Sequence, residues 1–250
     1  MNTEETNSSN SSVNTTLSIM SKNILLIGGS YGIGKTIAET LAKNNQVIVA
    51  SRSADGFDSE NIKHITFDAT GDDISEVELP DELHGFVYCP GSINLRPFKN
   101  LRNETFEEDF QLNFMAMVRA LKGVLPRLLK TEDASIVLFS TVAVKMGMPF
   151  HTSVSASKGA IEGFAKAFAA EYAPKIRCNV IAPSLTDTPL AERLLGDDRK
   201  KENAADRHPL KRVGETKDIA AMAHFLLGEE SSWITGQVFG VDGGMSTLRI

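Results

Sequence analysis

The sequence has little cysteine, no excess of positive charge and no long hydrophobic run. Its 250 residues include two cysteines and carry a formal net charge of −6. Two cysteines within apolar, strand-like stretches indicate free buried thiols in a reducing compartment, not a disulfide framework. The lack of a basic stripe argues against nucleic-acid binding. No stretch reaches the roughly 18 consecutive apolar residues that indicate a membrane-spanning helix, so neither nucleic acid nor a membrane is expected as a partner.

The first twenty residues contain very little that could be buried. Residues 1–20 are rich in Ser, Thr and Asn, a composition that predicts a disordered tail. They lack the basic start and the apolar core of a secretory signal. We therefore expect a cytoplasmic protein in which residues 21–250 form a single domain.

A glycine-rich turn between a predicted strand and a predicted helix organises the chain. Ile24–Ile27 are apolar enough to form a buried strand, and apolar residues then recur at helical spacing as far as Leu41. Between the two, Gly28, Gly32 and Gly34 permit a sharp turn and the close approach of a ligand. The N–H groups and dipole of the helix start then favour a phosphate. A turn that uses glycine for shape alone is the alternative.

The spacing Gly-x-x-x-Gly-x-Gly resembles the cofactor-binding turn of the short-chain dehydrogenase/reductase family, and the resemblance runs from about Lys22 to the C-terminus. Ile27 stands where that family has threonine. The resemblance implies an α/β fold, a doubly wound Rossmann fold with one parallel sheet of about seven strands and helices on both faces. It also implies that the cofactor contacts Gly28, Ser30, Tyr31, Gly32, Ile33 and Gly34.

The end of the second predicted strand bears on the choice of cofactor. Ser51 and Arg52 follow this strand, and no acidic residue is present to bind a ribose 2′-hydroxyl. Arg52 can pair with a 2′-phosphate as a planar fork, and the resemblance implies NADP(H) in preference to NAD(H). A solvated surface arginine is the alternative. Asp68, after the third strand, matches a family aspartate that contacts adenine, or it only begins a loop.

The catalytic signature of the family is Tyr-x-x-x-Lys, with an earlier serine and a helical asparagine. Lys158 and its Ser-Ala-Ser-Lys context match this signature, and Thr141 takes the place of the serine. Asn113, in a helix predicted over 105–130, matches the asparagine, which in the family holds a water near the lysine. Val154 stands at the tyrosine position and has no proton to give. Loss of a general acid costs about 10²–10⁴ in rate.

Three substitutes for the missing phenol are open. His151 lies just before the predicted helix and titrates near neutral pH. Tyr88 lies at the end of the fourth predicted strand, near the expected place of the nicotinamide. A water oriented by Thr141, or by its neighbour Ser140, is the third candidate. A solvated histidine and a tyrosine that only packs are the corresponding alternatives.

The remaining matches lie after the fourth and sixth predicted strands. Gly91 keeps only the glycine of the family pattern Asn-Asn-Ala-Gly, and would allow close approach of the cofactor. Pro183, Thr186 and Thr188 fit the pattern Pro-Gly-x-Val/Ile-x-Thr, which implies contacts to the nicotinamide carboxamide and a phosphate. Residues 188–209 are expected to form a short helical lid over the substrate. No metal is expected.

Two functions fit these observations. The first is an NADP(H)-preferring oxidoreductase that transfers a hydride between nicotinamide and a small carbonyl or alcohol substrate, with an atypical proton donor. The alternative is a catalytically silent dinucleotide-binding protein that acts as a sensor or partner subunit. The apolar helices predicted over 105–130 and 155–172 suit a homodimer or homotetramer, as the resemblance implies.

Overall fold

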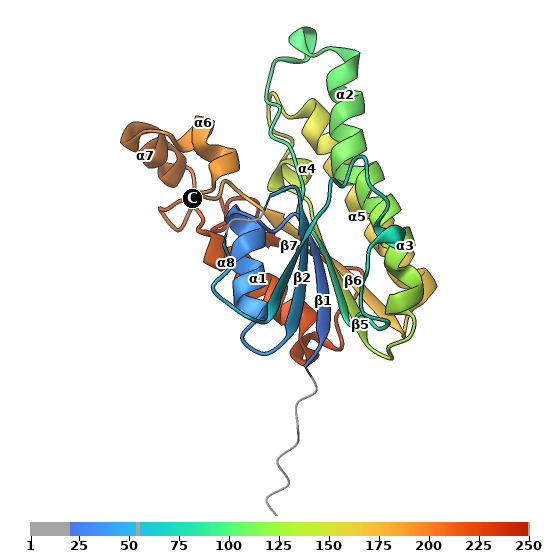
Figure 1. The fold of residues 1–250 in the computed structure, drawn as a ribbon. Helices are drawn as coiled ribbons and strands as arrows, with labels where there is room; N and C mark the ends of the chain where they lie inside the picture. Colours follow the sequence, from blue (N-terminus) through green and yellow to red (C-terminus); the bar gives the residue numbers. More distant parts are fainter. Residues whose placement is uncertain (1–20, 54–55, 250) are drawn as a thin grey trace, which may run out of the picture.

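The computed structural model describes residues 21–53 and 56–249, so the predicted tail over 1–20 lies outside the described residues. Seven strands form one parallel sheet in the order β3-β2-β1-β4-β5-β6-β7. The chain starts at the central strand, builds one half outward, and then crosses back to build the other half (Figure 1). The prediction of a doubly wound α/β fold is confirmed.

The first strand spans almost the predicted residues 24–27, and the second and third strands end at or just before Ser51 and Asp68, as predicted. The strands are β1 (Asn23–Ile27), β2 (Gln46–Ser51), β3 (Ile62–Thr66), β4 (Gly85–Tyr88), β5 (Ala134–Phe139), β6 (Ile176–Pro183) and β7 (Val238–Val241). The α-helices are α1 (Gly32–Leu41), α2 (Asn103–Phe110), α3 (Ala116–Leu128), α4 (Val142–Met146), α5 (Thr152–Tyr172), α6 (Glu192–Leu195), α7 (Asp198–Asp206) and α8 (Thr216–Leu227). Short 3₁₀ turns lie at Ile74–Glu76, Phe98–Asn100, Pro189–Ala191 and Glu229–Ser231.

Helices cover both faces of the sheet, and each face has its own hydrophobic core. Successive residues of a strand point to opposite faces, so Leu25 joins the core beneath α3 and α5 while Leu26 joins the core beneath α1 and α8. Leu121 represents the first helix layer and Ile37 the second. In Figure 1, α1 and α8 lie to the left of the sheet and α3 and α5 to the right. The strands therefore have apolar side chains on both faces, as buried parallel strands do.

The helix predicted over 105–130 is confirmed as one helical run over 103–128, which contains a wide turn that the prediction did not include. The chain forms α2, then a wide π-helical turn at Gln111–Met115, then α3. The wide turn buries Asn113 completely. Such turns are frequent at functional sites. The apolar side chains keep a helical rhythm through the turn, which is why periodicity does not reveal it.

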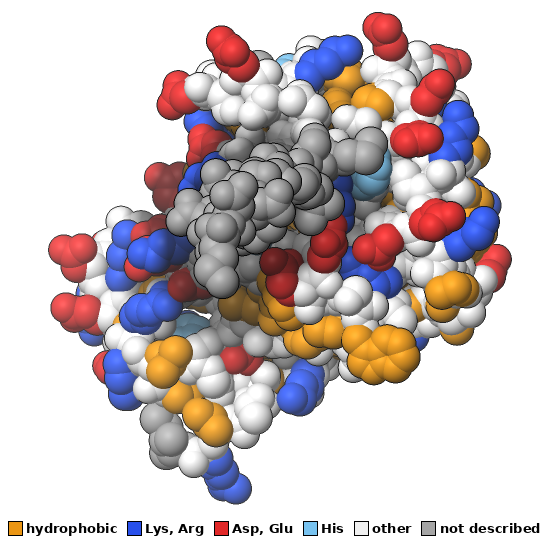
Figure 2. All heavy atoms as spheres, turned by 90° about the horizontal axis from the view of Figure 1, so that it is seen from below, with side chains coloured by type: hydrophobic (Ala, Val, Ile, Leu, Met, Phe, Trp, Pro, Cys, Tyr) orange, Lys and Arg blue, Asp and Glu red, His pale blue; other side chains and the backbone are white. Residues whose placement is uncertain are grey.

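The structure describes the surface and both cysteines, and Cys89 is less buried than expected. No helix in residues 21–53 and 56–249 is long and apolar enough to cross a membrane. On the face in Figure 2, acidic and basic side chains are interspersed, and no extended basic patch is visible outside the grey residues. Cys89 and Cys178 are both free, but only Cys178 is fully buried.

Candidate active site

The glycine turn after β1 is shaped for close packing and for a ligand. Gly28 and Gly32 have φ values of +77° and +59°, in the left-handed region that favours glycine. A Cβ at Gly28 would lie 2.8 Å from Cγ of Pro90, and a Cβ at Gly34 would collide with the Gly28 carbonyl oxygen. The turn therefore cannot accept side chains at Gly28 or Gly34 without moving.

The N-terminus of α1 is left open for an anion. Its capping residue, Tyr31, makes no side-chain capping hydrogen bond, and the first turn contains no acidic residue. Thr188 lies directly opposite, since a Cβ at Gly32 would be 3.6 Å from Thr188 Cβ. Helix N–H groups and a threonine hydroxyl together suit a phosphate. Thr188 also caps the following 3₁₀ turn, where its Oγ1 accepts from the Ala191 N–H (3.3 Å).

The tips of β2 and β3 lie side by side. Ser51 is buried, and its Oγ lies 2.9 Å from the Ser53 carbonyl oxygen and 3.0 Å from Nε2 of His64. Arg52 is exposed and close enough to Asp68 to act on its charge. Hydrogen bonds from Thr70 hold the pKa of Asp68 below its ordinary value, and Arg52 adds to this. Asp68 therefore orders its own loop and is ionised at neutral pH.

Lys158 is a buried ammonium group at the centre of the site. It lies one turn after Val154 on α5, and these side chains are only 7% and 6% exposed. Burial lowers the pKa of Lys158 to about 8, while the nearby Cys89 and Asp109 act to raise it. Among the described residues, the Lys158 ammonium donates no hydrogen bond. A buried charge without acceptors is costly, and this one is suited to ligand hydroxyl groups.

Gly91 and Asn113 meet at the Lys158 ammonium. A Cβ at Gly91 would lie 3.3 Å from Lys158 Nζ and 3.5 Å from Asn113 Oδ1. Asn113 Nδ2 donates to the hydroxyls of Ser92 and Ser157, each at 3.0 Å, and its Oδ1 accepts from the Ser92 N–H at 3.3 Å. The structure thus brings together three residues that the sequence singled out separately.

A buried carboxylate beside this group was missed by the sequence analysis. Asp109 is 1% exposed and accepts hydrogen bonds from Ser92 Oγ (2.5 Å), Asn94 Nδ2 (2.7 Å) and Ser153 Oγ (2.6 Å). It ties together α2, the segment after β4 and the start of α5. A signal was present, because Asp109 lies four residues before Asn113 in a mostly apolar helix pattern.

The two hydroxyl groups after β5 have different environments. Ser140 is buried and donates to Glu162 on α5 (2.5 Å). Thr141 is half-buried and caps α4, where its Oγ1 accepts from the Ala143 N–H (3.3 Å). The Thr141 hydroxyl hydrogen is thus not used by this cap, whereas Ser140 is committed to Glu162.

Two of the three suggested proton donors are tied to the protein. Tyr88 lies in the core instead of at the site, and its hydroxyl donates to the Leu112 carbonyl (2.7 Å). Burial raises the pKa of Tyr88 well above its ordinary value, so Tyr88 has the packing role that was the alternative. His151 Nδ1 lies 2.7 Å from the Pro149 carbonyl, which can only accept, so Nδ1 carries the proton. The donor role of His151 stays a prediction.

The segment after β6 lies under α6 and α7. Thr186 is buried, and its hydroxyl donates to the Ser184 carbonyl (3.0 Å). His208 is 2% exposed; its Nδ1 donates to the Ala204 carbonyl (2.7 Å), which leaves Nε2 to accept from the Ser184 hydroxyl (2.8 Å). Ser184 replaces the glycine that follows Pro183 in the family pattern. The segment 188–209, which is the predicted lid, is therefore anchored to the sheet edge by a side-chain hydrogen bond.

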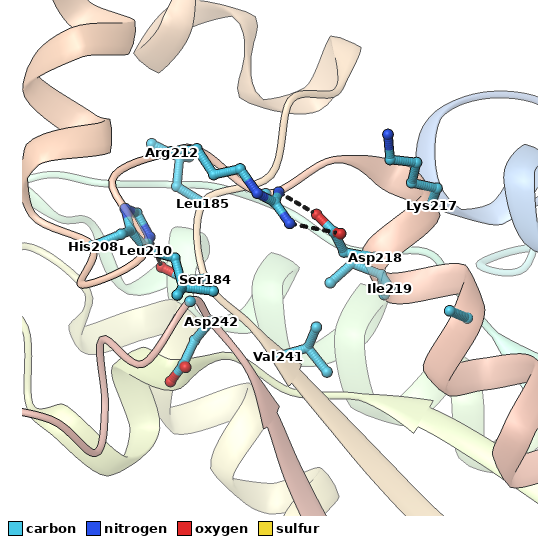
Figure 3. A pocket seen from close by; sticks show the side chains of 13 residues that line it. Ser184, Leu185, His208, Leu210, Arg212, Lys217, Asp218, Ile219, Val241 and Asp242 are labelled. Carbon is cyan, nitrogen blue, oxygen red and sulfur yellow. Dashed lines mark hydrogen bonds and ion pairs between the residues drawn. The ribbon is translucent and has the colours of Figure 1, made fainter.

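A cavity lies next to the hydrogen bond between Ser184 and His208. It has a volume of about 480 Å³ and is lined by Ser184, His208, Arg212, Asp218 and Asp242, among others. Figure 3 shows Arg212 paired with both carboxylate oxygens of Asp218, at 2.6 and 2.9 Å, while Lys217 points away. The Arg212 charge is thus matched by that of Asp218.

The residues present fit a dinucleotide. The glycine turn, the open start of α1 and the Lys158 ammonium, which has no acceptor in the part of the chain that the structure describes, all lie at the carboxyl ends of the parallel strands, where ligands of this fold class bind. In Figure 1 this edge is at the top, between α6–α7 and α2–α4. Among the described residues, no group of three or more His, Cys, Asp or Glu side chains could hold a metal.

Known proteins resemble the chain over almost its whole length. The profile of the family described as Enoyl-(Acyl carrier protein) reductase matches residues 28–246. The 3-oxoacyl-[acyl-carrier-protein] reductase of Thermotoga maritima is 29% identical over 242 residues, covering 88% of this chain and 96% of the relative. An uncharacterized oxidoreductase of Bacillus subtilis is 30% identical over 241 residues, covering 90% and 99%.

Solved structures are similar to the same extent. Ligand-free aldohexose dehydrogenase of Thermoplasma acidophilum superposes with a TM-score of 0.83 at 28% identity, covering 92% of this chain and 95% of the other. A tyrosine-to-phenylalanine variant of ElxO with NADPH bound gives a TM-score of 0.84 at 28% identity, covering 92% and 100%.

Proposed function

Because this chain belongs to the short-chain dehydrogenase/reductase family of NAD(P)-dependent oxidoreductases, we propose that it reduces a small carbonyl substrate, or oxidises the corresponding alcohol, with NADP(H). The observation that carries the proposal is the buried Lys158 ammonium, which has no acceptor among the described residues and lies beside Gly91. Such a charge is stabilised when ligand hydroxyl groups replace the water it lost.

The preference for NADP(H) rests on Arg52. Its side chain is exposed at the tip of β2, and its neighbour Ser51 has no charge to repel a 2′-phosphate. A guanidinium binds phosphate oxygens as a bidentate donor. The nearby Asp68 weakens this preference because it offers Arg52 a competing negative charge.

Each remaining side chain has a distinct role in this proposal. The cofactor, when bound, supplies or accepts the hydride. Lys158 donates hydrogen bonds to the nicotinamide ribose, and Thr141 donates its hydroxyl hydrogen to the substrate carbonyl oxygen. Asn113 holds the segment that begins at Gly91 against Lys158. The nicotinamide and phosphate side of the cofactor site is lined by Pro183, Thr186 and Thr188. The pyrophosphate side is lined by Ser30, Tyr31, Ile33 and the turn glycines.

The presence of a proton donor distinguishes the proposed oxidoreductase from a dinucleotide-binding protein without turnover. Val154 takes the tyrosine position, so we propose that the donor is atypical. The same valine favours a second candidate function, a dinucleotide-binding protein without turnover. The Tyr88 hydroxyl donates its hydrogen to the Leu112 carbonyl, so Tyr88 is removed from the candidate proton donors. This loss supports the second candidate function.

The cofactor proposal is tested by fluorescence titration of the natural protein with NADPH and NADH. NADPH is expected to bind more tightly. Arg52→Ala should weaken NADPH binding about tenfold or more, since hydrogen bonds to charged groups contribute about 1.5–3 kcal/mol, and leave NADH binding unchanged. Lys43→Ala, which removes an exposed charge after the other end of α1, is the control. Equal affinity for the two cofactors would contradict the preference, and no binding would contradict both candidate functions.

The substrate class is tested with carbonyls suggested by the relatives. Relatives are named for action on 3-oxoacyl-[acyl-carrier-protein] and on L-xylulose, and one solved structure is an aldohexose dehydrogenase. NADPH oxidation is therefore followed with acetoacetyl-coenzyme A and L-xylulose, and NADP⁺ reduction with an aldohexose. Turnover of any of them supports the oxidoreductase. Tight binding without turnover supports the silent protein.

Self-association and location complete the proposal. We propose a homodimer or homotetramer, supported by Phe110 and Met115, which are 39% and 37% exposed on the outer side of α2 and the π-helical turn. Light scattering at micromolar concentration is expected to give a multiple of 27.1 kDa, and a monomer would contradict it.

A cytoplasmic location is proposed from the two free cysteines.

A further inference from the structure

Two features of the site lie one helical turn apart and have complementary consequences. By the match to the family signature Tyr-x-x-x-Lys, Val154 stands at the position of the proton-donating tyrosine, and Lys158 holds a proton that no described residue accepts. We propose that Lys158 is the general acid of the carbonyl reduction, and that the buried Asp109 carboxylate is a positioning residue that stabilises the charged Lys158 ammonium. This inference rests on the proposed oxidoreductase function.

The surroundings of Val154 leave few other sources of a proton. Ser157 Oγ lies 3.1 Å from the Val154 carbonyl oxygen and accepts from Asn113. Burial raises the pKa of the Cys89 thiol to about 12, which makes it a weak acid at neutral pH. Lys158 has a buried position and no hydrogen-bond acceptor among the described residues, and its three N–H groups can serve both the ribose and the substrate oxygen.

Valine also changes the space around the ammonium. Val154 and Lys158 lie four residues apart on α5, so their side chains share one face of the helix. A branched three-carbon side chain is shorter than a phenol, so a substrate oxygen can approach Lys158 more closely than in a relative with tyrosine. The close approach of Gly91, where a Cβ would lie 3.3 Å from Nζ, fixes the other side.

Asp109 supplies the charge that keeps Lys158 protonated. Its carboxylate is buried and oriented by three side-chain donors on Ser92, Asn94 and Ser153. Burial alone would lower the affinity of Lys158 for its proton, and the Asp109 charge opposes this loss. The titratable groups that act on Lys158 are Cys89, after β4, and Asp109, on α2. Of these, Asp109 is the one whose oxygens accept three side-chain hydrogen bonds.

The proton and electron balance is complete with NADPH as the reductant. The hydride carries an electron pair to the carbonyl carbon, and the π pair of the C=O bond moves to the oxygen. An N–H bond of Lys158 breaks, its electron pair stays on nitrogen, and the proton goes to that oxygen to give the alcohol. The neutral amine then takes a proton from solvent. In the alcohol oxidation the neutral amine accepts the hydroxyl proton instead.

The direction of the pH dependence follows from this role. Reduction needs charged Lys158, so its rate should fall as pH rises through about 8, the pKa of Lys158. Oxidation needs the neutral amine, so its rate should rise through the same pH. In Asp109→Asn both transitions should shift to lower pH, because the charge that raises the lysine pKa is gone. A purely structural role of Asp109 would lower activity without moving the transitions.

The decisive experiment is rescue by small amines. Lys158→Ala should lose about 10²–10⁴ in NADPH-dependent reduction, and added ethylammonium should restore part of it, with a rate that follows the ammonium concentration as pH is varied. Lys158→Arg keeps the charge but cannot release a proton near neutral pH, so it should bind NADPH without turnover. His151→Gln tests the competing donor, and Asp73→Asn, on an exposed turn, is the control for Asp109→Asn.

The outcomes separate the inference from the proposed function. Turnover by the natural protein together with an active Lys158→Arg variant, or loss of the pH transition in His151→Gln, would overturn the inference and leave the oxidoreductase standing. No turnover by the natural protein overturns both. A measurement independent of activity is available, because the pH at which the Lys158 amine becomes reactive to trace acetic anhydride can be read by mass spectrometry. It should be near 8 and lower in Asp109→Asn; an unchanged value in Asp109→Asn would overturn the positioning role.

Discussion

The half of the site around the glycine turn and the half around Lys158 have changed to different extents. The first half keeps the family spacing at Gly28, Gly32 and Gly34, together with an open helix start. The second half, if Lys158 is the lysine of the family signature as we propose, has valine for tyrosine, threonine for serine, and Tyr-Cys-Pro before Gly91. It also has a buried carboxylate, Asp109, with three side-chain hydrogen-bond donors.

The difference shows which physical requirement each half has to meet. Phosphate binding depends on backbone N–H groups and on the absence of side chains, so few sequences satisfy it. Proton transfer needs a group of suitable pKa within reach of the reacting oxygen, and more than one residue type meets that need. The second half can therefore change its residues more freely than the first half can change its glycines.

The largest effect, on NADPH affinity, is expected when a side chain is added in the half of the site around the glycine turn. Gly34→Val would press a side chain onto the Gly28 carbonyl oxygen, and overpacking of this kind costs about 1–3 kcal/mol or more. NADPH affinity should fall about 100-fold or become unmeasurable in a fluorescence titration. The matched control is Gly163→Ala on α5, which meets nothing within 4 Å and should stabilise the helix by about 0.5–1 kcal/mol. Normal NADPH binding by Gly34→Val would show that the turn does not hold the phosphates.

In the half of the site around Lys158, stability should be most sensitive to loss of the Asp109 carboxylate. Asp109→Ala leaves the donors of Ser92, Asn94 and Ser153 without their acceptor, and each unsatisfied buried group costs about 1–3 kcal/mol. We expect a loss of about 3 kcal/mol in urea denaturation. Asp68→Ala, which removes a carboxylate from a loop that is only half-buried, should lose clearly less. Equal losses would mean that the network contributes no more than a surface turn.

A smaller effect on stability is expected at Lys158, where substitution should stabilise the protein instead of destabilising it. Its folded pKa of about 8 lies below the ordinary 10.5, so the unfolded chain binds more protons between these pH values. Stability of the natural protein without cofactor should therefore rise as pH increases from about 8 to 10.5. Lys158→Met should be more stable by about 1–2 kcal/mol at pH 7, because no unpaired charge is buried, and should lack this rise. Thermal unfolding against pH measures both, and a less stable Lys158→Met would show that the ammonium is well paired.

The smallest effect is expected at the lid anchor. Ser184→Gly restores the family residue and removes the hydrogen bond to His208, which contributes about 1 kcal/mol. Protease cleavage within 188–209 should become faster while global stability changes little. Unchanged cleavage would show that the lid is held by its apolar contacts alone, such as those of Leu195 and Ala204.

The sequence was sufficient for the strands and the glycine turn, because both depend on local patterns. The apolar run Ile24–Ile27 before the glycine turn locates β1 within one residue, as expected for a buried parallel strand. Helical periodicity was also present over 105–130, but an apolar rhythm does not reveal a π-helical turn. What could not be predicted are contacts between distant segments, such as Asp109 with Ser153 or Tyr88 with Leu112. A polar residue on an apolar stripe gives only a hint of such a contact.

The most direct test of the account compares NADPH oxidation by the natural protein and by Val154→Tyr with the same carbonyl substrates. The account predicts that the natural protein turns over with a rate that falls above about pH 8, the pKa of Lys158, and that Val154→Tyr is active with a different pH profile set by the phenol. Tight NADPH binding by both proteins, with turnover by Val154→Tyr alone, would contradict it and identify the natural chain as a silent binder of the dinucleotide.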